Sequence, residues 1–267
     1  MNVSSGLLRV FAVLALVLGG CASIDVASPD VRQLLAPTGK LRVGLYPGSP
    51  TSLIRDAATG ESRGVGHDLG RELAKRLGVP FEPVIFQRNA QVMDAMKAGQ
   101  LDAVFTNATA ARARDMDFAP PLLDLELGYL VAQNSTITTL SDIDRAGVRV
   151  GVSEGSTSLG VLSRDLRQAS VVAVPSFKAA IEMLSSGRLD AFATNKAVLF
   201  ELSDELRGSR VLEGRWGLEH IAFGIPKGRE AAMPYLRRFV DEARRDGSAA
   251  KAVSRAGLRG SAAIDAR

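Results

Sequence analysis

Gly99-Gln-Leu-Asp-Ala-Val-Phe-Thr-Asn107 is followed, 88 residues further along the chain, by Gly187-Arg-Leu-Asp-Ala-Phe-Ala-Thr-Asn195. Both copies follow the pattern G-x-L-D-A-x-x-T-N, and both come directly after an amphipathic segment that predicts a helix, 90–98 and 176–186. The alternative is chance similarity between two buried strands of one sheet. Six matching positions of nine, at equivalent places in two strand–helix units, favour two similar lobes.

The segments around the first copy predict strands that alternate with helices of about ten residues. Strands are predicted at 41–45, 81–86 and 101–105, and a helix is predicted around Leu69, Leu73 and Leu77, ending at Gly78. A second, shorter repeat pairs Arg42-Val-Gly44 with Arg149-Val-Gly151. Alternation of this kind is typical of parallel βαβ units, so we assign the chain to the α/β class.

The two repeats also predict where a ligand binds. Ligands of open parallel sheets bind outside the carboxyl ends of the strands. Two lobes that face each other would therefore place Asn107 and Asn195 on opposite walls of one cleft.

The N-terminus has the features of an export signal, assigned to residues 1–20. Arg9 precedes the apolar run 10–18, which is too short to span a bilayer. Leu18-Gly-Gly-Cys21 resembles a bacterial lipobox, in which the cysteine is lipidated, and Cys21 is the single cysteine of the chain. An ordinary signal peptide with an incidental cysteine is the alternative. We expect an exported, lipid-anchored protein with residues 21–37 as a tether.

Composition excludes several classes of function. The 267 residues are 46% hydrophobic, which is ordinary for a globular protein and allows one large or two smaller domains. The net charge is +4, but no run of five like charges exists, so no nucleic-acid-binding tail is expected. One cysteine and the distant His67 and His220 do not predict a disulfide or a metal site, and we expect no cofactor.

The order and spacing of further motifs resemble those of the family 3 extracellular solute-binding proteins of bacterial ABC importers. Each motif is weak alone, but together they extend from about Gly39 to Arg259. They are Gly39-Lys-Leu-Arg-Val-Gly44, Gly64-Val-Gly-His-Asp-Leu-Gly70, Gly99–Asn107, Thr109-Ala-Ala-Arg112, Asp117-Phe-Ala-Pro-Pro121, Val148–Thr157, Gly187–Asn195 and Gly224-Ile-Pro-Lys-Gly228.

This resemblance implies the type II periplasmic-binding-protein fold, with two α/β lobes and a hinge of two crossing strands. Lobe one would comprise residues 38–125 and 223–260, and lobe two residues 126–222. The implied partners are a small solute, the membrane through the lipid anchor, and an ABC permease with its ATPase. We expect a monomer in the periplasm whose lobes close on the ligand.

The resemblance also implies a ligand site. In the family, Thr109-x-x-Arg112 would hold a ligand carboxylate, because arginine offers a planar bidentate fork. Arg114 is an alternative, since counting forward from Asp102 favours it. The turn containing Ser156 and Thr157 would bring hydroxyls and helix N–H groups to the same anionic end of the ligand.

Two departures from the family pattern concern the ligand ammonium. Asn195 and Tyr46 stand where many relatives carry a carboxylate, and Ser49 stands at the position of an aromatic residue. An amide lacks the charge-assisted strength of a carboxylate. We therefore expect a cleft that does not strongly prefer amino acids over their deaminated carboxylate analogues.

The function that these observations favour is a non-enzymatic receptor for a small carboxylate-bearing solute. An exported, dehydratase-like enzyme on the same scaffold is the alternative, and it would need a poised acid or base in the cleft. Glu154 and Glu219 are acids near strand ends, but only Glu154 is an obvious candidate in lobe two, and it has no paired partner in the sequence. The two histidines are expected to be packing or surface residues.

Overall fold

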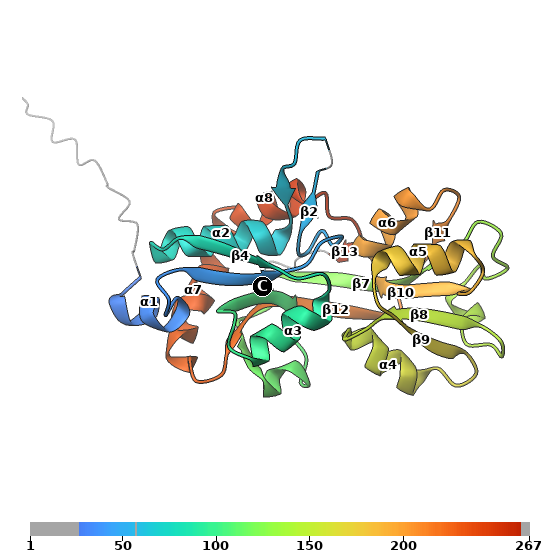
Figure 1. Cartoon of the computed structure of the whole chain (residues 1–267), viewed down its shortest axis with the longest axis horizontal. Helices are drawn as coiled ribbons and strands as arrows, with labels where there is room; N and C mark the ends of the chain where they lie inside the picture. The colour runs from blue at the N-terminus through green and yellow to red at the C-terminus, as the bar shows by residue number, and fades with distance from the viewer. Residues whose placement is uncertain (1–26, 57, 263–267) are drawn as a thin grey trace, which may run out of the picture.

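The computed structural model describes residues 27–56 and 58–262 and shows two α/β lobes joined by two long strands (Figure 1). The first lobe contains strands β1 (Leu41–Leu45), β4 (Phe81–Ile85), β5 (Ala103–Asn107) and β6 (Met116–Phe118), the hairpin β2 (Ile54–Arg55) and β3 (Ser62–Arg63), and helices α1 (Pro29–Leu35), α2 (Val65–Leu77), α3 (Asn89–Lys97), α7 (Met233–Arg245) and α8 (Ser248–Arg255). The second lobe contains β8 (Arg149–Ser153), β9 (Ser170–Val174), β10 (Ala191–Asn195), β11 (Arg210–Val211), α4 (Thr157–Asp165), α5 (Phe177–Ser185) and α6 (Lys196–Glu205). The joining strands are β7 (Leu123–Val131) and β12 (Gly217–Pro226), and β13 (Ser261–Ala262) pairs with β7.

The joining strands place both lobes in one hydrogen-bonded sheet of order β4-β1-β5-β12-β7-β10-β8-β9. In the first lobe β1 pairs in parallel with β4 and β5, and in the second lobe β8 pairs in parallel with β9 and β10, as the alternating pattern predicts. β12 pairs antiparallel with β5 and β7, and β7 pairs antiparallel with β10. Figure 1 shows helices on both sides of the strands in each lobe. The two-lobed α/β fold with two crossing strands is therefore confirmed.

The repeated Asp residues have the same structural role in both lobes. Asp102 accepts hydrogen bonds from the backbone N–H, Nε and Nη2 of Arg42, and Asp190 accepts the same three from Arg149. Each Arg Nη2 also donates to the carbonyl of the repeat's first glycine, Gly99 or Gly187. These contacts tie the start of one strand to the turn before the next parallel strand.

The glycine of each Arg-Val-Gly repeat packs against the leucine of the longer repeat in the same lobe. A Cβ on Gly44 would lie 2.4 Å from Cδ1 of Leu101, and a Cβ on Gly151 would lie 2.4 Å from Cδ1 of Leu189. A leucine side chain therefore occupies the space beside a bare backbone in both lobes. Strand β5 begins at Ala103, two residues later than predicted.

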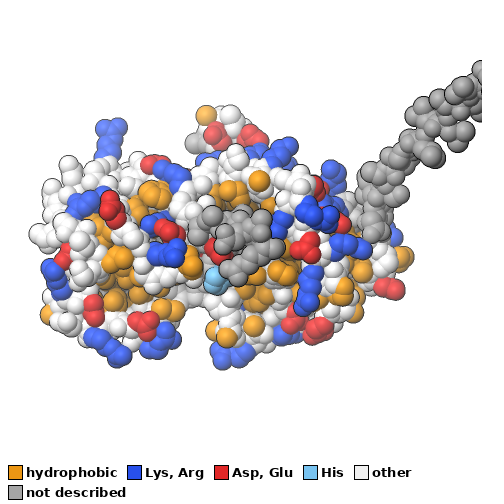
Figure 2. Space-filling model, turned by 180° about the vertical axis from the view of Figure 1, so that it is seen from behind, with side chains coloured by type: hydrophobic (Ala, Val, Ile, Leu, Met, Phe, Trp, Pro, Cys, Tyr) orange, Lys and Arg blue, Asp and Glu red, His pale blue; other side chains and the backbone are white. Residues whose placement is uncertain are grey.

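Each lobe has its own hydrophobic core. The first is built around Leu41, Leu69, Phe223 and Phe239, with a smaller cluster under α3. The second has two clusters, one on each face of β10, because alternate side chains of this strand point to opposite faces of the sheet. Figure 2 shows a waist between the two halves and basic side chains interspersed with acidic ones over the face in view.

The expected tether at 21–37 is wrong for its second half. The Ser28 hydroxyl accepts from the backbone N–H of Val31, and Pro29 occupies the first turn, so a helix starts here. The resulting α1 buries Leu35 completely in the core of the first lobe. The polar residues before this helix predict a tether, but the burial of the helix's apolar side chains attaches it to the core. Residues 27–36 therefore belong to the first lobe.

The predicted signal peptide and Cys21 lie outside the described residues. In the part of the chain that the structure describes, no helix has the length and apolar character needed to cross a bilayer.

Candidate ligand-binding site

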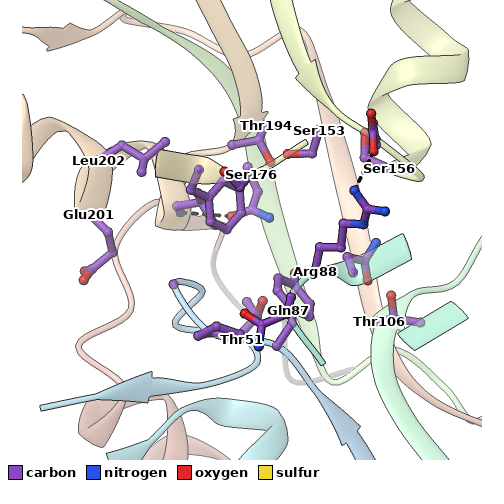
Figure 3. Close-up of a pocket in the computed structure, with 18 of the residues that line it drawn as sticks. Thr51, Gln87, Arg88, Thr106, Ser153, Ser156, Ser176, Thr194, Glu201 and Leu202 are labelled. Carbon is purple, nitrogen blue, oxygen red and sulfur yellow. Dashed lines mark hydrogen bonds and ion pairs between the residues drawn. The ribbon is translucent and has the colours of Figure 1, made fainter. Parts of the chain in front are cut away.

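A cavity of about 500 Å³ lies between the lobes, and it is lined by residues of both. It is located at the carboxyl ends of β5 and β10, where a ligand site of an open parallel sheet is expected. Of the residues selected from the sequence, those that line it are Tyr46, Asn107, Arg112, Ser156, Thr157 and Asn195. Figure 3 shows the lining side chains converging from both lobes.

Thr109 is the predicted site residue that does not line the cavity. Its Oγ1 accepts a hydrogen bond of 3.3 Å from the backbone N–H of Arg112. This bond shapes the short 3-10 turn Arg112–Arg114 and thereby positions the arginine. Arg114 is exposed and lies outside the lining, so Arg112 is the arginine that the fold directs into the cavity.

The Arg112 guanidinium is held by neutral acceptors. Its Nη1 donates to Thr106 Oγ1 at 2.6 Å and to the Asn107 carbonyl at 3.3 Å. Among the described residues, no carboxylate lies within ion-pair distance of it. Burial lowers the pKa of Arg112, and the charge of Glu219 opposes that shift. Because arginine stays protonated at physiological pH, the cavity contains a positive charge without a contacting counter-ion.

Asn107 connects the first lobe to both the hinge and the second lobe. Its Oδ1 accepts from the backbone N–H of His220 on β12 at 3.0 Å. Its Nδ2 donates to Thr157 Oγ1 at the start of α4 at 3.1 Å.

Asn195 is fixed by a different pair of contacts. Its Oδ1 accepts from the backbone N–H of Val198 and so caps the N-terminus of α6. Its Nδ2 donates to Glu219 Oε2 at 3.0 Å.

The expected placement of the two asparagines on opposite walls is wrong. Both side chains lie beside the hinge strand β12, bridged by Thr157 and Glu219. The reason is topological, because β5 and β10 both pair with the crossing strands and their carboxyl ends converge there.

Glu219 is the residue whose importance the sequence reasoning missed. Its exposed fraction is 8%, it lines the cavity, and burial raises its pKa. One signal was available. Along β12, Glu219 alternates with the exposed His220 and shares the inward face with the buried Ile221 and Phe223, an unusual position for an acid.

An aromatic wall is supplied by the second lobe. Ser49, where the family resemblance implies an aromatic residue, is fully buried and shares a 2.8 Å hydrogen bond with Thr51. Phe177, the first residue of α5, lines the cavity and approaches Gly48 closely enough that a Cβ there would lie 3.0 Å from its ring. Tyr46 lines the cavity from the first lobe, and burial raises its pKa.

Direct contacts cross the cleft at its mouth. Arg88 Nη1 lies 3.0 Å from Glu154 Oε2, and Figure 3 marks this ion pair running from Arg88 towards Ser156. A Cβ on Gly155 would lie 2.7 Å from that of Ala90, so the backbone of the second lobe touches α3. The two lobes are therefore in direct contact beside the cavity.

The remaining candidates have structural roles. His67 is buried, contacts Asp68 and packs edge-on against Phe81, whereas His220 is half exposed and contacts Asp124. The Glu154 side chain is 40% exposed and forms an ion pair with Arg88. Within the described residues, no group of three His, Cys, Asp or Glu side chains is arranged to hold a metal ion.

Comparison with known proteins agrees with this architecture. Residues 41–257 match the profile of the family described as bacterial extracellular solute-binding proteins, family 3. The ABC transporter glutamine-binding protein GlnH of Bacillus subtilis (strain 168) is 21% identical over 253 residues, covering 91% of this chain and 92% of the relative.

Solved structures of similar fold include two from different sources. The ancestral amino acid-binding protein AncCDT-1, a precursor of cyclohexadienyl dehydratase, is 25% identical with a TM-score of 0.72, covering 84% of this chain and 97% of that one. The solute receptor for L-cysteine of Neisseria gonorrhoeae is 23% identical with a TM-score of 0.74, covering 84% and 92%. By the extent of the family match, this chain belongs to the bacterial extracellular solute-binding proteins of family 3.

Proposed function

We propose that this protein captures a small carboxylate-bearing solute, an amino acid or a related organic acid, between its lobes and delivers it to the permease and ATPase of an ABC importer. The observation that carries the proposal is that the partly buried guanidinium of Arg112 lines a cavity of about 500 Å³ and contacts no carboxylate of the described residues. The name of the Bacillus subtilis relative, an ABC transporter glutamine-binding protein, supports the transport role.

The proposed anion site combines three contributions. Arg112 offers a bidentate fork, and the N-terminus of α4 adds free N–H groups and the positive end of a helix dipole. Ser156 caps this helix through its Oγ, which accepts from the backbone N–H of Leu159, and Thr157 opens it. A carboxylate between Arg112 and α4 would bind both lobes at once.

Ligand binding at both lobes would couple to lobe closure. We propose that the first lobe comprises residues 38–125 and 223–260, to which α1 adds residues 27–36, and that the second comprises residues 126–222, so that the boundaries fall inside β7 and β12. Bending of these two strands would open the cleft, a hinge motion of the kind that periplasmic binding proteins use. The protein would act as a monomer.

The Arg112→Ala variant tests the anion site. It should weaken binding of the cognate solute by roughly 1.5–3 kcal/mol or more, the range for hydrogen bonds to charged groups. The ligand is first identified by thermal shift against amino acids and organic acids, because a ligand of the native state raises the melting temperature. Arg114→Ala is the matched control, since Arg114 is exposed. A loss confined to Arg114→Ala in calorimetric titration would reverse the assignment.

The proposed location is the periplasm, with Cys21 as the lipid attachment site. Cys21→Ala should abolish membrane association, because the variant lacks the thiol that would carry the lipid. The check is partitioning into detergent phase, and equal partitioning of wild type and variant would contradict the anchor.

A dehydratase-like enzyme remains the second candidate, favoured by the likeness to a precursor of cyclohexadienyl dehydratase. It would require a general acid in the cavity. Four acids line the cavity, Glu154, Glu201, Glu205 and Glu219, and Glu219 is the one whose side chain is buried. Incubating bound solutes with the protein and searching for product by mass spectrometry separates the two functions, because a receptor returns its ligand unchanged.

A further inference from the structure

Because Asn195 is an amide, the sequence predicts no carboxylate for a ligand ammonium. The structure nevertheless places the carboxylate of Glu219 in the cavity. We propose that Glu219, on the hinge strand β12, is the counter-ion of a cationic group of the ligand, so that the cavity selects solutes carrying an ammonium near a carboxylate. This inference rests on the proposed receptor function and reverses the expectation that deaminated carboxylates bind equally well.

The first support is that only neutral donors contact the Glu219 carboxylate. Oε2 accepts from Asn195 Nδ2 at 3.0 Å, and Oε1 accepts from Thr157 Oγ1 at 3.5 Å. A carboxylate can accept about four hydrogen bonds. No Lys, Arg or His of the described chain contacts it within ion-pair distance, although its exposed fraction is 8%. Burial disfavours the charged form of this carboxyl, and a cationic ligand group at the unfilled acceptor positions would stabilise it.

The second support is the pairing of opposite charges in one cavity. Arg112 and Glu219 both line it, and each influences the ionisation of the other without forming a contact. A zwitterion can place its carboxylate at Arg112 and its ammonium at Glu219. A simple carboxylate pairs with Arg112 but is repelled by Glu219. A simple amine pairs with Glu219 but is repelled by Arg112.

The third support is the fixed orientation of Asn195. Because its Oδ1 caps α6 by accepting from Val198, its Nδ2 must face Glu219. A donor at this point suits a neighbouring carboxylate and does not suit an ammonium. Asn195 on β10 and Gly217 on β12 both pair with Leu127 of β7. In this chain β12 therefore supplies a carboxylate beside the amide that β10 supplies.

The experiment uses four forms of the full chain. They are the wild type, Glu219→Gln, the charge-swapped double variant Asn195→Asp with Glu219→Gln, and the control Glu182→Gln, which neutralises an exposed carboxylate of α5. The double variant keeps a helix cap and a hydrogen bond between the two side chains with the roles reversed. The probes are the twenty common L-amino acids and their deaminated analogues, measured by thermal shift and then by calorimetric titration.

We expect the wild type to bind one or more amino acids at least roughly tenfold more tightly than the deaminated analogues, the size of a charge-assisted hydrogen bond. Glu219→Gln should lose this preference, the double variant should regain it, and Glu182→Gln should match the wild type. Recovery in the double variant shows that charge, rather than a folding defect of the single variant, is responsible.

Four results would overturn the inference. Wild-type preference for the deaminated carboxylates, or undiminished amino acid preference in Glu219→Gln, would leave the receptor function standing and remove the role of Glu219. Loss of preference in Glu219→Gln without recovery in the double variant would assign Glu219 a structural role. Absence of binding to any amino acid or carboxylate would overturn the proposed function, and this inference with it.

Discussion

At the scale of single residues, the protonation of Glu219 connects stability to ligand binding. Burial is the main cause of its raised pKa, and the hydrogen bonds from Asn195 and Thr157 and the charge of Arg112 oppose the shift only in part. The folded state therefore binds this proton more tightly than the unfolded state does. An ammonium placed beside the carboxylate would lower the pKa again, so binding would release a proton.

The sign of the pH effect follows from that shift. Without ligand, the contribution of Glu219 to stability is fully present below the ordinary carboxyl pKa of 4.5 and is lost as the pH rises through the raised folded value. Glu219→Gln should lack this loss, so the variant should gain stability relative to the wild type across that range. Urea unfolding of both proteins at a series of pH values measures the difference. Parallel curves at every pH would contradict it.

At the scale of elements, the Arg–Asp pairs of the repeat hold each lobe together to different degrees. The Asp102 side chain is 0% exposed and contacts Arg229 as well as Arg42, whereas the Asp190 side chain is 32% exposed and pairs with Arg149. Removing one partner of a buried pair costs far more than removing one partner of a solvated pair.

The two aspartates therefore form a matched experiment. Asp102→Asn should lower the free energy of unfolding by about 3 kcal/mol or more, because it leaves two arginines without their carboxylate. Asp190→Asn should cost on the order of 1 kcal/mol, because water screens the pair. The denaturant midpoints of the two variants provide the comparison. Equal losses in the free energy of unfolding would show that the different burial of the two aspartates does not affect their contribution to stability.

At the scale of the whole molecule, closure depends on small residues where the lobes meet. Gly155 of the second lobe lies against Ala90 of α3, and the ion pair between Arg88 and Glu154 is adjacent. A larger side chain at Ala90 would occupy the space that Gly155 fills when the lobes are closed.

Ala90→Leu should weaken ligand binding roughly tenfold or more while leaving each lobe folded, because affinity falls in proportion to the population of the closed state. Small-angle X-ray scattering with ligand should show a more open particle than the wild type. Ala98→Leu, the same substitution at the exposed end of α3, is the control. A closed wild-type-like particle with unchanged affinity would contradict the steric role of Ala90.

The same scale shows what the sequence by itself determined. The repeat G-x-L-D-A-x-x-T-N predicts two equivalent strand–helix units, because its glycine, leucine and aspartate contact Gly44 and Arg42 in the first lobe and the matching Gly151 and Arg149 in the second. The α/β class, the two lobes and the arginine of T-x-x-R could therefore be predicted from local pattern and family resemblance. Arg112 lines the cavity because Thr109, three residues earlier, shapes its turn.

Only the tertiary structure decided which residues meet in the cavity. Glu219 lies 24 residues from Asn195 and 62 from Thr157 along the chain, and the crossing of β12 and β7 brings the three together. A pattern of residue types shows that a carboxylate is absent from one strand, but it does not show that another strand supplies one at the same point in space. Charge acts through distance in three dimensions, so the electrostatic balance of the cleft depends on the register of the hinge strands.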